Sequence, residues 1–141
     1  MPFLIGVALA LATCVFASLV GLDRDRAFYP TVLWVIATYY ALFAIMGGSL
    51  GALVFESVVI AGFLLLAFAG FRWTLWLVVA GLAGHGLFDL LHRHVVDNRG
   101  VPSWWPSFCL AYDATVALWL GWLLARLRIP PAPLRGAPRG R

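Results

Sequence analysis

The chain lacks lysine altogether and contains few charged residues of any kind. Charged side chains make up 11% of its 141 residues, whereas 63% are hydrophobic. A soluble domain carries a charged fraction of about 25%, so this composition excludes an ordinary water-soluble globular protein. The absence of lysine also excludes chemistry through a Schiff base to retinal or to another carbonyl cofactor.

Only two cysteines are present, and both lie in apolar stretches. Cys14 and Cys109 therefore cannot form the framework of several disulfides that stabilises small secreted domains. The motif Leu-Ala-Thr-Cys that ends at Cys14 resembles a lipoprotein signal, but no basic segment precedes it. We predict that residues 3–21 are retained as a first helix.

Apolar stretches of membrane-spanning length recur along the chain and predict five transmembrane helices. The predicted fold class is all-α, an integral membrane bundle that forms a single domain over residues 1–128. The predicted spans are approximately Phe3–Leu22, Tyr29–Gly47, Leu50–Gly70, Trp73–His94 and Pro106–Leu127. Residues 129–141 are rich in proline, glycine and arginine and predict a disordered basic tail.

The arginines predict how the bundle is oriented. With five spans, Arg93 and Arg99 fall on one side of the membrane and the other eight arginines on the opposite side; a four-helix interpretation destroys this division. The positive-inside rule then places the C-terminus in the cytoplasm and the N-terminus outside, with the bacterial inner membrane as the expected location. The basic tail is expected to contact anionic lipid, and no nucleic-acid partner is expected.

Ionisable residues gather in the outer halves of the last three predicted helices. His85, Asp89 and His92 are spaced i, i+4, i+7, which places them on one helix face. Glu56, His85 and Asp113 are expected at a common depth, about 10 Å below the outer boundary. Because ionisable groups in a bilayer usually face the bundle interior and each other, we expect all five to converge in one pocket.

These residue types are those that bind a transition metal. Imidazole and carboxylate ligands suit divalent zinc or iron, and also manganese, and helical bundles build such sites from facing side chains. We predict His85, Asp89 and His92 as the metal ligands, with Glu56 or Asp113 completing the shell or acting as the catalytic base. The predicted function is a metal-dependent membrane enzyme that acts on a lipid-like or other apolar substrate from the outer leaflet. Hydrolysis by an activated water is the default reaction, with oxidation by iron left open.

Other functions explain the same residues. A metal-free site could bind a small ligand or relay protons in transport. The polar side chains could also only hold helices together, with Asp89 bonded to His85 and Asp113 bonded to His92, as in a structural subunit of a membrane complex. Association with a second copy of the chain is left open. Cys109, one turn before Asp113, is interpreted as a packing residue rather than a nucleophile.

The segment between the last two helices, residues 98–108, contains two prolines and two tryptophans. Trp104 and Trp105 predict an anchor at the membrane interface, with a lid over the site as the alternative. Asn98 and Asp97 are predicted to cap the helix end in solvent rather than to line the mouth of the site.

One pattern of residues extends over 80–122, about a third of the chain. It consists of His85-x3-Asp89-x2-His92, then Pro102 and Pro106, then Cys109-x3-Asp113-x3-Ala117-x-Trp119. This pattern resembles that of a family of small bacterial membrane proteins of unknown function. The resemblance implies that the histidines, the aspartates and the cysteine form one signature, and it implies no activity. The ceramidase-like zinc hydrolases of membranes are similar in chemistry, but they have a His-x3-His element that this chain lacks.

Overall fold

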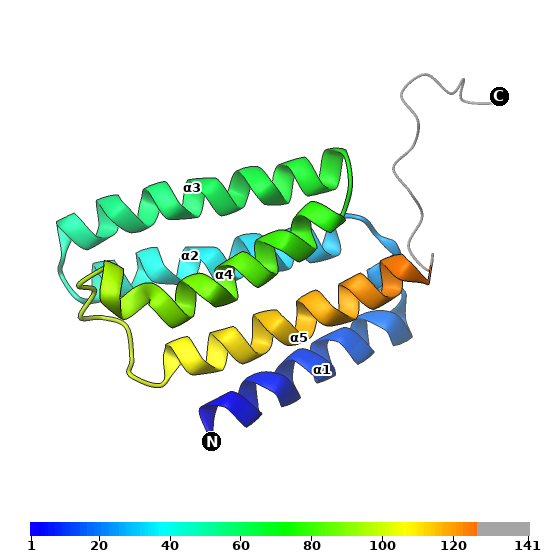
Figure 1. Ribbon diagram of the computed structural model, residues 1–141, viewed down its shortest axis with the longest axis horizontal. Coiled ribbons are helices and arrows are strands. Elements are labelled where there is room, and N and C mark those ends of the chain that lie inside the picture. The colour runs from blue at the N-terminus through cyan, green and yellow to red at the C-terminus, as the bar shows by residue number, and fades with distance from the viewer. Residues whose placement is uncertain (127–141) are drawn as a thin grey trace.

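The computed structural model describes residues 1–126, which form a bundle of five long α-helices (Figure 1). The described part is all-α, as predicted. The predicted tail, residues 129–141, lies outside the described residues. The helices are α1 (Pro2–Val20), the short 3-10 helix η1 (Leu22–Arg24), α2 (Phe28–Met46), α3 (Leu50–Arg72), α4 (Trp76–Val95) and α5 (Trp105–Ala125).

Local sequence signals explain where the helices begin and end. Gly21 ends α1 with a φ of 83°, a left-handed conformation that glycine adopts without a steric penalty. Ser49 caps α3, because its side chain accepts a hydrogen bond from the backbone N–H of Ala52. The predicted boundaries differ most between α3 and α4: α3 continues to Arg72, and α4 begins at Trp76 rather than Trp73.

Successive helices run antiparallel, so the connections alternate between the two ends of the bundle (Figure 1). The N-terminus, the α2–α3 turn and the α4–α5 connection lie at one end, which we call the loop end. At the opposite end, the Arg26 side chain donates to the backbone oxygens of Gly70 and Phe71, at 3.3 Å each. The described arginines are divided as predicted, with Arg93 and Arg99 at the loop end and Arg24, Arg26, Arg72 and Arg126 at the other.

Helix α4 lies in the middle of the bundle and packs against α2, α3 and α5, whereas α1 packs against α5. Its buried face combines small and apolar residues with three polar ones, His85, Asp89 and His92. At Gly86 a β-carbon would lie 3.4 Å from the β-carbon of Asp113, so a glycine here lets α5 approach closely. This central position explains how a helix with so many polar residues can be buried.

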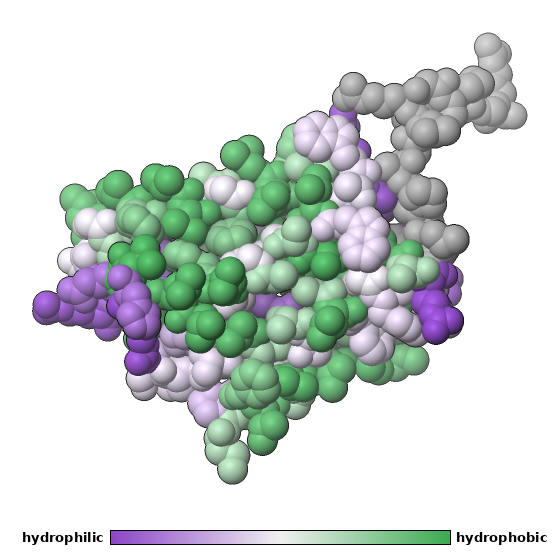
Figure 2. Space-filling model, viewed as in Figure 1, coloured by the Kyte–Doolittle hydropathy of each residue, from purple (hydrophilic) through white to green (hydrophobic). Residues whose placement is uncertain are grey.

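Four of the helices, α1, α2, α3 and α5, are long and apolar enough to cross a membrane. Large apolar side chains are exposed on their outer faces, among them Leu19, Val58 and Leu118. Figure 2 shows the same pattern, with hydrophobic residues over the middle of the visible face and hydrophilic residues towards both ends. These features indicate insertion into a membrane, where lipid covers the apolar surface.

Helix α4 does not reach the same apolarity, because five of its residues are histidine, aspartate or arginine. A fifth span and the orientation of the bundle therefore remain predictions. The antiparallel arrangement nevertheless places α4 alongside three of the four apolar helices, α2, α3 and α5 (Figure 1).

Candidate metal centre

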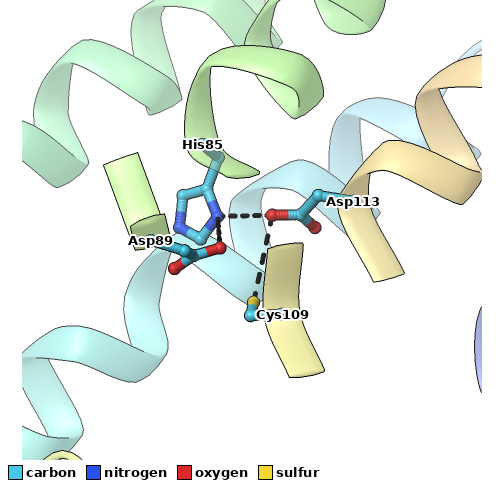
Figure 3. A group of neighbouring side chains, drawn as sticks. All are labelled: His85, Asp89, Cys109 and Asp113. Atoms are coloured by element: carbon cyan, nitrogen blue, oxygen red, sulfur yellow. Dashed lines mark hydrogen bonds and ion pairs between the residues drawn. The ribbon is translucent and has the colours of Figure 1, made fainter. Parts of the chain in front are cut away.

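Four side chains that can bind a metal meet between α4 and α5 (Figure 3). They are His85 and Asp89 from α4, and Cys109 and Asp113 from α5. One ligand atom from each lies within 4.8 Å of the others, and all four side chains are buried. We call this group the His/Asp/Cys cluster.

The cluster consists of two pairs of residues, each pair spaced i, i+4 on its own helix. This spacing puts the two side chains of a pair one turn apart on the same face. Since α4 and α5 turn these faces towards each other, four ligand atoms converge without any contribution from a loop. Helices hold such side chains more precisely than loops do.

His85 is at the centre of the contacts within the cluster (Figure 3). A hydrogen bond joins its Nδ1 atom to Oδ2 of Asp113 at 2.6 Å, and Oδ2 of Asp89 lies 3.4 Å from the same nitrogen. The Cys109 sulfur lies 3.9 Å from Oδ2 of Asp113. Phe63 from α3 packs its edge against the His85 ring, with centroids 4.9 Å apart, and so closes the site with an apolar side chain.

Tyr40 of α2 ties a third helix to the cluster. Its hydroxyl donates to Oδ1 of Asp89 at 2.5 Å, and the side chain is fully buried. The Tyr40 ring also stacks on the ring of His92, with centroids 4.2 Å apart and planes 24° from parallel. Tyr40 therefore lies between the cluster and a second group of polar residues.

This second group consists of His92, Glu56 and Asn98 and lies nearer the loop end. Nε2 of His92 is 2.6 Å from Oε1 of Glu56, a residue of α3. The Asn98 side-chain amide donates to the same carboxylate oxygen at 3.1 Å and to the backbone oxygen of Tyr40 at 3.2 Å. We call this group the Glu56–His92 pair with its Asn98 donor.

All five predicted site residues are buried, but they lie in two layers instead of one pocket. His85, Asp89 and Asp113 belong to the cluster, whereas His92 and Glu56 bond to each other. Seven residues of helix separate His85 from His92, which is about 10 Å along the axis, so a shared face does not mean a shared site. The expected common depth of Glu56, His85 and Asp113 is corrected accordingly, because Glu56 lies at the level of His92.

Two further expectations concern the end of α4 and the connection that follows it. His94, the third histidine, is exposed near the end of α4 and belongs to neither of the two polar groups. Asn98, which we expected in solvent, is only 7% exposed because its amide binds Glu56. Its neighbour Asp97 is exposed and lies 3.8 Å from Arg99.

Cys109 is the residue of the cluster that sequence reasoning missed as a ligand. Its i, i+4 relationship to Asp113 was the available signal, but a buried cysteine in an apolar helix is more often a packing residue. Only the position of α5 against α4 shows that its sulfur faces the same space as His85 and Asp89.

Each of the three carboxylates in these two groups keeps one oxygen without a hydrogen-bond partner among the described residues. These atoms are Oδ2 of Asp89, Oδ1 of Asp113 and Oε2 of Glu56. An unpaired charged oxygen in an apolar interior is costly, so a bound cation or proton is expected to satisfy it.

Two cavities adjoin these groups from different directions. A polar pocket of about 600 Å³ at the loop end is lined by His92 and Asn98, among other residues. An apolar groove of about 450 Å³ lies between α1, α2 and α5, and Cys109 is part of its lining. The polar groups of the bundle interior are therefore bordered by a hydrophilic space on one side and a hydrophobic one on the other.

No protein-family model, no curated protein and no solved structure matches this chain. The resemblance to a family of small bacterial membrane proteins therefore stays a prediction, and the function is inferred from the geometry of the site.

Proposed function

We propose that this protein is an integral membrane enzyme that binds one divalent transition metal and hydrolyses a lipid-like substrate. The proposed ligands are His85, Asp89, Cys109 and Asp113. The observation that carries the proposal is that one ligand atom from each of these buried residues lies within 4.8 Å of the other three. Ionisable groups inside a membrane bundle are costly, and they usually mark a functional site.

The types of ligand favour zinc or iron over the harder cations. Thiolate sulfur and imidazole nitrogen suit zinc and iron(II), whereas calcium and magnesium prefer oxygen ligands only. Held by these residues, such a metal would act as a Lewis acid that polarises a carbonyl oxygen. This role requires an open coordination position, so the metal would have to accept a fifth ligand or be held by only three of the four residues.

The distances in the cluster are compatible with this class of metal. Two nitrogen or oxygen atoms that bind the same tetrahedral zinc ion lie about 3.3 Å apart, because each bond to the metal is about 2.0–2.1 Å long. His85 Nδ1 and Asp89 Oδ2, at 3.4 Å, already have this separation. The His85 and Asp113 atoms, at 2.6 Å, are at hydrogen-bonding distance. A metal bound between them would take the place of the shared proton, and the distance between the two atoms would have to increase by less than about 1 Å.

The remaining polar residues have supporting roles in this proposal. Tyr40 orients the Asp89 carboxylate by donating to Oδ1, which leaves Oδ2 directed at His85. Glu56 bonds to His92 one layer away from the cluster, so as the candidate base it would have to act through intervening water, with Oε2, which has no hydrogen-bond partner among the described residues, as the acceptor. Its partner His92 lines the polar pocket, from which water and protons can reach the site.

A metal-free role is the second candidate, and the two short hydrogen bonds favour it. His85–Asp113 and His92–Glu56, at 2.6 Å each, are hydrogen-bonded pairs that hold α4 to α5 and to α3 without a metal. In that case the cluster would store a proton or only join helices.

The proposed orientation keeps the N-terminus outside and the C-terminus in the cytoplasm of a bacterial cell. It rests on the division of the arginines between the two ends of the bundle. The loop end, with the polar pocket, then faces outwards. Reporter fusions after Gly48 and after Thr74 test it, because five spans place the first outside and the second in the cytoplasm.

Hydrolysis of a fluorogenic long-chain acyl ester by the protein in detergent micelles tests the enzymatic proposal. We expect turnover that is lost with a chelator, restored by Zn²⁺ or Fe²⁺, and abolished in His85→Ala. Asp25→Asn is the control, because Asp25 is exposed at the end of the bundle opposite the polar pocket and its substitution should leave turnover unchanged. Turnover that persists in the chelator or in His85→Ala would assign the reaction to something other than this centre. If metal binds but esters, amides and phosphoesters with acyl chains are all left intact, the hydrolytic function is wrong.

A further inference from the structure

The apolar groove between α1, α2 and α5 lies between two parts of the bundle that have little backbone contact. α2 packs on α3 and α4, and α1 packs on α5, but α2 has few backbone contacts with α1 or α5. At the loop end the gap is closed by Trp105, whose ring meets Tyr39 and Phe43 with centroids 5.2 and 4.8 Å away. Away from these aromatic contacts the gap remains as a groove of about 450 Å³.

We infer that this groove binds one acyl chain of a bilayer lipid and presents the lipid to the His/Asp/Cys cluster. The inference rests on the proposed function, since it names the substrate class and the place where that substrate is held. Four observations carry it: the shape of the groove, its surface, its continuity with the lipid-facing side of the bundle, and its contact with the cluster.

The shape fits one hydrocarbon chain. The lining residues of α2 run from Phe28 to Tyr39, a length of about 16 Å at a rise of about 1.5 Å per residue. Spread over that length, about 450 Å³ gives a mean cross-section of about 28 Å², far too narrow for a helix of about 10–12 Å diameter. A transmembrane helix of a partner or of a second copy therefore does not fit into the groove.

The surface of the groove is apolar and continuous with the surface that faces lipid. Its rim includes Leu9 and Val35, which are 48% and 47% exposed on two membrane-spanning helices. A chain can therefore slide in sideways from the bilayer without crossing water. Pockets of this size that are mainly apolar are typical of sites for small ligands.

The two ends of the lining on α5 differ in chemistry. Trp105, at the start of the helix, has a buried indole N–H with no hydrogen-bond partner among the described residues. This donor lies near the loop end, where tryptophans meet the ester and head-group region of a bilayer. One turn deeper, Cys109 lines the groove and also lies 3.9 Å from Asp113, so a bound lipid would contact the cluster at Cys109 and be separated from Asp113 by that side chain.

Photo-crosslinking tests this inference without requiring metal or turnover. The protein is reconstituted in vesicles of phosphatidylcholine and phosphatidylglycerol that contain a phosphatidylcholine with a diazirine in one acyl chain. After illumination, labelled residues are mapped by peptide mass spectrometry. We expect residues 105–112 of α5 to be labelled several-fold more than the exposed outer face of α3.

Val35→Phe fills the groove, and Val58→Phe adds the same side chain to an exposed valine on the outer face of α3. We expect several-fold less α5 labelling in the first variant and wild-type labelling in the second. Uniform labelling of all lipid-facing helices would overturn the inference. Equal labelling of α5 in wild type and in Val35→Phe would also overturn it. If Val35→Phe does not fold, the ratio of α5 to α3 labelling in the wild type is decisive by itself.

The metal content of the same samples separates the two proposals. Selective labelling in a protein that binds no metal would leave the groove in place and remove the proposed metal centre. Uniform labelling in a protein that binds metal would remove the lipid-binding groove and leave the proposed metal centre in place.

Discussion

The imidazole of His85 and the carboxylate of Asp113 face each other across α4 and α5, with Nδ1 and Oδ2 2.6 Å apart and both side chains buried. This contact joins the two helices at the point where Gly86 allows them to approach. It also fixes the two side chains around which the rest of the cluster is arranged.

Replacing Asp113 by alanine should destabilise the bundle even when no metal is present. His85 would lose its closest partner in an apolar interior, and breaking a buried ion pair costs roughly 3–5 kcal/mol. The measurement is the unfolding midpoint in detergent micelles that contain a chelator. Asp97→Ala is the control, because Asp97 is exposed and should leave the midpoint unchanged. Equal midpoints for Asp113→Ala and wild type would mean that the contact contributes nothing to stability.

Cys109 should be the residue that distinguishes a metal centre from a hydrogen-bonded cluster. A thiolate bound to Co²⁺ produces a charge-transfer band in the near ultraviolet, so cobalt-loaded wild-type protein should show this band and Cys109→Ser should not. Cys14→Ser is the matched control, because Cys14 is a buried cysteine of α1 outside the cluster. Persistence of the band in Cys109→Ser would exclude this sulfur as a ligand.

Tyr40→Phe should weaken metal binding without removing any ligand. The Tyr40 hydroxyl holds Asp89 through Oδ1, and loss of such a supporting hydrogen bond typically lowers metal affinity by about 10- to 100-fold. Competition with a chromogenic chelator measures this change. Tyr39→Phe serves as the comparison, since Tyr39 packs on Trp105 in the groove. A chelator titration in which both variants match the wild type would argue against a role for Tyr40 in orienting Asp89.

Glu56→Gln should affect stability but not metal content. The change weakens a buried hydrogen bond to His92, which is expected to cost roughly 1–3 kcal/mol, while the four cluster ligands stay in place. The unfolding midpoint and the metal-to-protein ratio are measured on the same preparation. Loss of metal in Glu56→Gln would instead support the interpretation from the sequence, in which Glu56 or His92 belongs to the metal shell.

Much of the fold follows from local sequence patterns. The apolar runs around Ile5, Ile36 and Leu65 are long enough to span a bilayer, and Gly21, Gly48 and Ser49 mark the turns between them. The burial of His85, Asp89 and Asp113 is also predictable, because charged groups in apolar helices turn towards the bundle interior.

The pairing of these polar side chains cannot be predicted in the same way. From spacing alone, Asp113 could serve His92 as well as His85, since both histidines lie on one face of α4. Which one it meets depends on how far α5 is shifted along α4 and how it is rotated, and packing over the whole length of the helices sets both quantities. For the same reason, sequence patterns predict Cys109 as a packing residue and place Asn98, beyond the end of α4, in solvent.

Elemental analysis of the purified protein tests the central claim most directly. After expression in medium with zinc and iron, we predict about one divalent transition metal per chain in the wild type, the stoichiometry of a single four-ligand site. In Asp89→Ala the ratio should fall close to zero, while His94→Ala should match the wild type. A folded wild-type protein that contains no such metal, and takes up none when Zn²⁺ or Fe²⁺ is added, would contradict the account.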